Sequence, residues 1–330
     1  MAEFGLRHHR PRGASRDMTT TYDEVDFTSM DTRCAARHYR SESDRLSGPY
    51  GRPVVVMAHG FGGTMDSGLE PFADRLCAAG ADVLTFDYRG FGASDGRPRQ
   101  SVSVTRQLQD FHAAVVAAQR LPGVDPVRVA LWGSSFSGSH VIRVAAGRAD
   151  VAAVIAMTPL TSGLAASRAA VAHRDVGAAL RWSLVGAKSR VAVACGRAPS
   201  LMPLAARPGQ PGALALDGAY DSYLSIAGPT WRNEVDAAIG MELVKVRTAK
   251  EAKRIRVPVL VQIADFDRFV PAESVARTAV QARAQVHHYP CDHFDVWPGH
   301  DWHDRAATDQ AAFLTRVFAQ RSPARTVRTG

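Results

Sequence analysis

The chain has 330 residues, 46% of them hydrophobic, which is enough for a full α/β core with a smaller accessory region. No run of about 18 apolar residues exists to span a bilayer, and no apolar segment follows the basic N-terminal residues as in a secretory signal. We therefore expect a cytoplasmic protein without a membrane partner.

The formal net charge of +8 is concentrated at the two ends of the chain. Residues 1–20 and 323–330 contain several arginines without hydrophobic periodicity, which predicts a loose leader and a loose tail. Aromatic residues are not interleaved with the basic ones, so a nucleic-acid partner is not expected. The four cysteines form no CxxC pair and no cluster with zinc spacing, so neither a disulfide framework nor a metal site is expected.

Apolar runs typical of buried strands alternate with amphipathic segments typical of helices over the first half of the chain. Two modest strand candidates come first, at 22–27 and 35–39. The expected strands that follow are 53–58, 83–86, 127–132 and 153–157, and the expected helices are 70–79, 102–120 and 140–146. This alternation predicts an α/β fold with a mostly parallel central sheet flanked by helices.

The alternation stops near residue 160, and residues 160–250 contain several prolines and only short helical stretches. We expect this segment to be a mainly helical cap, inserted after the sixth strand, over the carboxyl edge where open α/β sheets bind ligands. The expected elements after the cap are strands at 257–263 and 286–289 and helices at 272–282 and 302–320. The core should therefore comprise residues 21–159 and 251–322.

The stretch Gly133-Ser134-Ser135-Phe136-Ser137 joins an expected strand to an expected helix. A serine at the tip of such a turn is typical of a nucleophile elbow, in which small residues two positions before and after allow the tight bend. Gly133 and Ser137 meet that requirement, with serine at a position where glycine is commoner. Ser135 is therefore the candidate nucleophile.

Two further loops follow strands at the same edge of the expected sheet. Asp265 and Asp267 come directly after the strand at 257–263, and His293 comes after the strand at 286–289. A serine hydroxyl needs a base to take its proton and an acid to orient that base, so these loops supply candidates for both. The neighbouring histidines, His287, His288, His300 and His303, compete with His293.

Four motifs in order, including His59-Gly60-Phe61-Gly62-Gly63 and the loop at 87–94, resemble those of the α/β-hydrolase superfamily. The chain is similar to its serine hydrolases near the dienelactone hydrolases and serine aminopeptidases. The resemblance covers residues 53–320 except the cap. It implies Ser135 as the nucleophile, His293 as the general base and Asp267 as the acid, because the family places its acid three residues before a Val-Pro pair. Asp265 remains the alternative acid.

The same resemblance implies an oxyanion hole built from the backbone N–H groups of Phe61 and Phe136. One departure from the family is Asp292, which precedes His293 where glycine is usual. A carboxylate there would favour the imidazolium and raise the pKa of His293. The loop at 87–94 is interpreted as structural.

The resemblance implies hydrolysis of a carboxylic ester, lactone or thioester through an acyl-serine intermediate, without a cofactor. Acyl transfer, or cleavage of an amide or carbon–carbon bond, is possible on the same scaffold, as is a non-catalytic ligand-binding protein. Apolar and aromatic cap residues suggest a fairly apolar acyl substrate, although most of them are expected to pack the cap onto the core. The oligomeric state stays open, with a homodimer possible. These cap residues are Trp182, Leu201, Met202, Leu204, Tyr220, Tyr223, Leu224 and Trp231.

Overall fold

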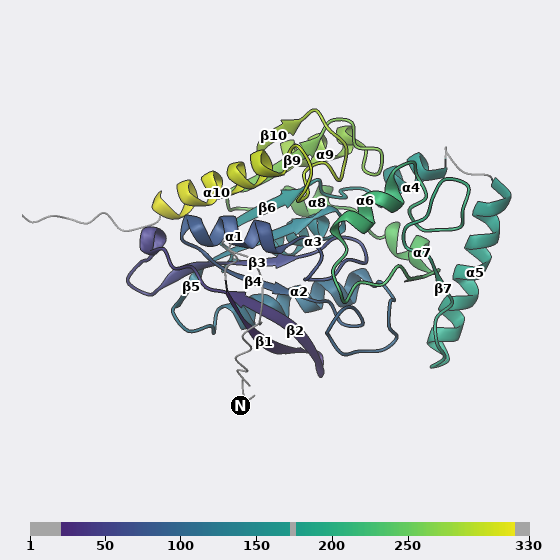
Figure 1. Cartoon of the computed structure of the whole chain (residues 1–330), viewed down its shortest axis with the longest axis horizontal. Helices are drawn as coiled ribbons and strands as arrows, with labels where there is room; N and C mark the ends of the chain where they lie inside the picture. Colours follow the sequence, from purple (N-terminus) through teal and green to yellow (C-terminus); the bar gives the residue numbers. More distant parts are fainter. Residues whose placement is uncertain (1–20, 172–175, 321–330) are drawn as a thin grey trace, which may run out of the picture.

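The computed structural model describes residues 21–171 and 176–320, so the expected leader and tail lie outside the described residues. Its centre is an eight-stranded sheet with the order β1-β2-β4-β3-β5-β6-β9-β10 (Figure 1). The strands are β1 (Tyr22–Ser29), β2 (Thr32–Tyr39), β3 (Arg52–Ala58), β4 (Asp82–Phe86), β5 (Val124–Ser134), β6 (Ala153–Met157), β9 (Val259–Ala264) and β10 (Gln285–Tyr289).

Only β2 runs against the rest of the sheet. β1 pairs antiparallel with β2 and β2 antiparallel with β4, whereas the pairs from β4 to β10 are parallel. Residues 54–56 of β3 are three consecutive valines with no exposed surface, as expected of a parallel strand covered on both faces. The mostly parallel sheet predicted from the sequence is confirmed.

The covering helices fall into two groups, as right-handed crossovers require. Helix α1 packs against α10, whereas α2, α3, α8 and α9 contact one another in series. Their bounds are α1 (Glu70–Ala79), α2 (Val104–Ala118), α3 (Ser135–Ala146), α8 (Ala249–Ala252), α9 (Ala272–Ala282) and α10 (His303–Gln320). The expected helix at 140–146 is too short at its start, because the serine- and glycine-rich first turn lacks the apolar periodicity on which the prediction relied.

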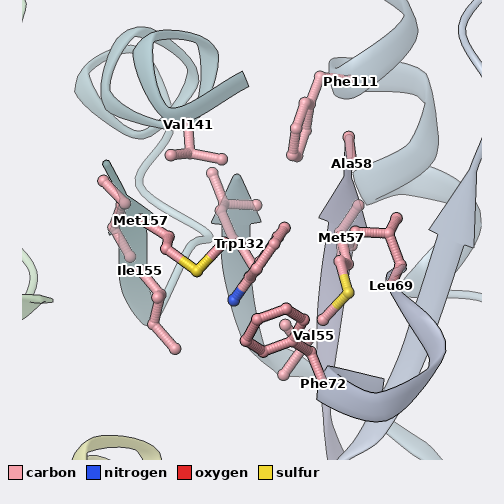
Figure 2. Packing of buried hydrophobic residues seen from close by; sticks show 14 of the residues in the cluster. Val55, Met57, Ala58, Leu69, Phe72, Phe111, Trp132, Val141, Ile155 and Met157 are labelled. Atoms are coloured by element: carbon pink, nitrogen blue, oxygen red, sulfur yellow. The ribbon is translucent and has the colours of Figure 1, made fainter. Parts of the chain in front are cut away.

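Buried side chains pack closely around β5, the strand that leads to the candidate nucleophile. Trp132 of β5 has no exposed surface, and Figure 2 shows it among Met57, Phe72 and Met157. Its indole N–H donates to the side-chain oxygen of Gln310 in α10 at 2.8 Å, so the one polar atom of the indole is satisfied. The last helix therefore secures the strand from which Ser135 projects.

The segment 160–250, which we call the cap segment, lies between β6 and β9. Figure 1 shows its helices gathered at one end of the molecule, with α5 outermost. Its elements are α4 (Gly163–Val171), α5 (Val176–Ala194), β7 (Leu201–Met202), α6 (Ala219–Ile226), β8 (Val235–Asp236) and α7 (Ile239–Leu243). Within the described part of the chain, no helix is both long and apolar enough to cross a membrane.

Candidate active site

Ser135 occupies a strained turn between β5 and α3. Its φ of +49° lies in the left-handed region, which non-glycine residues rarely adopt. The turn leaves no room at Gly133, where a Cβ would lie 2.3 Å from the carbonyl oxygen of Ser137. A strained serine at the end of a buried strand is the backbone geometry of a nucleophile elbow.

A buried hydrogen-bond network explains why Ser137 replaces the commoner glycine. The Ser137 hydroxyl donates to the backbone carbonyl of His59, so the Tyr88 hydroxyl must donate to Ser137, at an oxygen–oxygen distance of 2.7 Å. Both side chains are buried. Ser137 therefore ties the elbow to the loops that follow β3 and β4.

His293 and Asp267 form a close pair, with 2.6 Å between the imidazole Nδ1 and the carboxylate Oδ2. Their side chains are only 5% and 3% exposed. The other Asp267 oxygen accepts the backbone N–H groups of Phe269 and Val270 at 2.8 and 2.7 Å, which fixes the carboxylate. Nδ1 of the imidazole is thereby committed to Asp267, which leaves Nε2 for a reacting group.

The rival carboxylate faces away from this pair. Asp265 lies 2.6 Å from Nδ1 of His288, and its side chain is 36% exposed. Of the other competing histidines, His287 pairs with Asp309, and His303 packs edge-on against Phe72. The geometry therefore brings Asp267, and not Asp265, to His293.

Two carboxylates act on the charge of His293. Burial by itself lowers the pKa of the imidazole, but Asp267 beside it, and more weakly Asp292, raise the pKa above its ordinary value. Asp292 accepts the backbone N–H of His293 at 2.8 Å and the guanidinium Nε of Arg268 at 2.6 Å. The direction expected from the Asp292 position thus agrees with the pKa of His293.

Ser135 and His293 line one cavity of about 440 Å³ between the sheet edge and the cap segment. No hydrogen bond joins the Ser135 hydroxyl to His293 among residues 21–171 and 176–320; such contacts often close only around substrate. The remaining wall is mostly apolar and includes Trp182, Met202, Leu214, Ile239, Met241, Leu243 and Val244. Of the apolar and aromatic cap residues considered in the sequence analysis, Trp182, Met202 and Tyr223 line the cavity, whereas Leu201 and Leu224 are 42% and 43% exposed.

The two predicted oxyanion residues meet beside Ser135. Phe136 is the second residue of α3, so its N–H is among the first four donors, which have no partner inside the helix. Phe61 lies in the loop after β3, and its ring centroid is 6.1 Å from that of Phe136. A Cβ on the neighbouring Gly60 would lie 3.1 Å from Cβ of Ser135, so this loop passes directly over the elbow.

The sequence did not predict the contacts of two residues at the site, although Tyr223 was among the aromatic cap residues considered. The Tyr223 hydroxyl, from the cap segment, donates to the backbone carbonyl of Phe61. Arg268 lines the cavity and pairs with Asp292. Neither stands in a recognisable motif, although Arg268 directly follows the predicted acid. Among the described residues, no cluster of three or more His, Cys, Asp or Glu could hold a metal ion.

The sheet order, the elbow and the placement of the paired acid and histidine after β9 and β10 define an enzyme of the α/β-hydrolase class. A hydrolase family model, described as serine aminopeptidase S33, matches residues 51–292. The chain therefore belongs to that family, as the sequence resemblance predicted.

Three similar proteins illustrate the relationship. The quorum-quenching protein AidA of Acinetobacter baumannii is 34% identical over 297 residues, covering 89% of this chain and 94% of AidA. The thiohydrolase aneE of Aspergillus aculeatus is 36% identical over 141 residues, 42% of each chain. The crystal structure of the α/β hydrolase GrgF from a Penicillium species has a TM-score of 0.72 at 20% identity, covering 91% of this chain and 99% of GrgF.

Proposed function

We propose that the protein hydrolyses a carboxylic ester, lactone or thioester through an acyl-serine intermediate. The observation that carries this proposal is that Ser135, with its backbone in the left-handed region, and His293, which is paired with Asp267, line one apolar cavity. The names of two relatives, a quorum-quenching protein and a thiohydrolase, are compatible with this substrate range.

In the first step, Nε2 of His293 takes the Ser135 hydroxyl proton while Oγ bonds to the carbonyl carbon of the substrate. The electron pair of the C=O bond moves onto oxygen, where the N–H groups of Phe61 and Phe136 stabilise the charge. One such donor typically lowers the barrier by about 3 kcal/mol. The intermediate collapses, the C–O or C–S bond breaks, and the leaving group takes the proton from His293. Asp267 holds the imidazole in the required tautomer.

In the second step, His293 takes a proton from water, whose oxygen attacks the acyl-serine carbonyl. The same two N–H groups stabilise the second oxyanion, and its collapse returns the proton to Ser135 and releases the acid. The apolar wall contributed by the cap segment suits an acyl substrate of moderate size. The substrate is accordingly expected to be fairly apolar around its acyl group.

A fluorophosphonate probe tests the nucleophile directly. We expect it to label the wild type and the Ser167→Ala variant, which alters another serine of the same cavity, but not Ser135→Ala. Initial rates on esters, lactones and thioesters of graded chain length then identify the scissile bond. A wild type that neither reacts with the probe nor turns over p-nitrophenyl butyrate would contradict the proposal and favour a ligand-binding role.

A further inference from the structure

The loop that carries Phe61 contains a tight turn. The N–H of Gly63 donates to the carbonyl of Gly60 at 3.4 Å, which closes the turn. Gly62 has a φ of +63°, whereas Phe61 does not have a positive φ, so the turn is of type II. Type I and type II turns differ by a flip of the central peptide, here the one that joins Phe61 to Gly62. The direction of the Phe61 carbonyl therefore distinguishes the two turn types.

A cap residue holds that carbonyl. The Tyr223 hydroxyl donates to it, and the Tyr223 side chain is buried, with 3% of its surface exposed. The Tyr223 ring stacks on Trp231 with 5.5 Å between centroids and meets the ring of Phe294 edge-on at 5.4 Å. Phe294 is the residue after His293, so a single tyrosine of α6 contacts both the Phe61 loop and the histidine loop.

The Phe61 loop is confined on both sides. Towards the elbow, a Cβ on Gly60 would lie 3.1 Å from Cβ of Ser135. Towards the cap segment, a Cβ on Gly62 would lie 2.0 Å from Cδ1 of Leu204. The turn therefore lies between the candidate nucleophile and the cap segment and is close to both. The cap segment supplies two of its contacts, the Leu204 side chain and the Tyr223 hydrogen bond.

We propose that Tyr223 is a positioning residue whose hydrogen bond to the Phe61 carbonyl holds the Phe61 turn, and with it the proposed oxyanion-hole donor, in place beside Ser135. The inference rests on the proposed function. The hydroxyl satisfies the buried carbonyl of the same residue whose N–H is the proposed oxyanion donor. Without that partner the carbonyl would turn towards another donor, and the Phe61 backbone would no longer be held in place beside Ser135. Stabilisation of the transition state should therefore depend on Tyr223 more than substrate binding does.

The experiment compares Tyr223→Phe with Tyr220→Phe, a tyrosine of the same helix whose ring contacts Arg207. On a p-nitrophenyl ester we expect Tyr223→Phe to lower kcat about tenfold with KM nearly unchanged. Loss of a donor itself costs more, about 10²- to 10³-fold. Tyr220→Phe should behave like the wild type in both parameters.

Two matched ketones separate positioning from packing. A trifluoromethyl ketone forms a hemiketal oxyanion with the serine, whereas the corresponding methyl ketone reports ground-state binding. We expect Tyr223→Phe to weaken the trifluoromethyl ketone about tenfold, in parallel with kcat, and to leave the methyl ketone unaffected. Equal weakening of both ketones, or an unchanged kcat in an active enzyme, would overturn the inference. An inactive wild type that the fluorophosphonate probe does not label would instead overturn the proposed function.

Discussion

Asp292 contacts His293 through the main chain and not through the ring: its carboxylate accepts the His293 backbone N–H at 2.8 Å. The same carboxylate is held by Arg268, which offsets its charge. A negative group therefore stands one residue from the candidate general base, at a position where the family usually has glycine. Its effect on catalysis is electrostatic and can be measured.

Replacing Asp292 should move the acid limb of the pH–rate profile. The proposed mechanism needs neutral His293, and Asp292 raises the pKa of that imidazole, so the wild type should lose activity at a higher pH than Asp292→Gly or Asp292→Asn. The measurement is kcat/KM against pH. Arg268→Gln is a control for which the opposite shift is expected. It leaves the Asp292 carboxylate without its positive partner, so the acid limb should move to higher pH. Superimposable profiles for wild type and both Asp292 variants would refute this.

The two carboxylates of the acid loop should differ greatly in importance. Asp267→Asn removes the acceptor that fixes the His293 tautomer, and kcat should fall about 10⁴-fold, as in serine protease triads. Asp265→Asn breaks only an exposed pair with His288 and should change kcat by less than about twofold. Steady-state kinetics on one ester decide between them, and a larger loss in Asp265→Asn would reverse the assignment.

Ser137→Gly should cost stability while leaving the elbow intact. Glycine fits the turn, but the buried Tyr88 hydroxyl loses its acceptor, so the free energy of unfolding should fall by about 1–3 kcal/mol. Urea denaturation at pH 7 measures this. In a double-mutant cycle with Tyr88→Phe, the combined loss should be smaller than the sum of the single losses. Strict additivity would mean that the two hydroxyls are not coupled.

Asp82 should make the fold sensitive to acid. Burial opposes its ionisation, but hydrogen bonds from His38 and Arg52 and from the Ser41 N–H lower its pKa below the ordinary value of 3.8. Its contribution to stability is therefore present above pH 3.8 and lost as the pH falls through the lower pKa of the folded state. Asp82→Asn should destabilise the protein by about 3 kcal/mol at pH 7, because it leaves the half-buried Arg52 guanidinium without its carboxylate partner. Its unfolding free energy should also depend less on pH between 2 and 4 than that of the wild type, as denaturation curves at several pH values can establish.

The elbow could be predicted from the sequence because its determinants are local: a buried strand, small residues and a serine at fixed spacing. The acid loop was harder, because Asp265 and Asp267 are two residues apart and only the fold shows that they face different histidines. Tyr223 was among the aromatic cap residues considered, but its contact with the Phe61 loop could not be predicted. It contacts Phe61 across 162 positions, and nothing in the cap segment indicates which of its aromatic residues turns inward.

The cap segment interrupts the chain between Ser135 and the pair formed by Asp267 and His293, yet β6 and β9 on either side of it pair directly, with Val154 opposite Val259. A protease that cut the exposed stretch after α5, near Arg197, would therefore produce two fragments that stay associated through the pairing of β6 with β9. The nicked protein should still accept the fluorophosphonate probe, at a rate that reveals how far the reactivity of Ser135 depends on an unbroken cap segment.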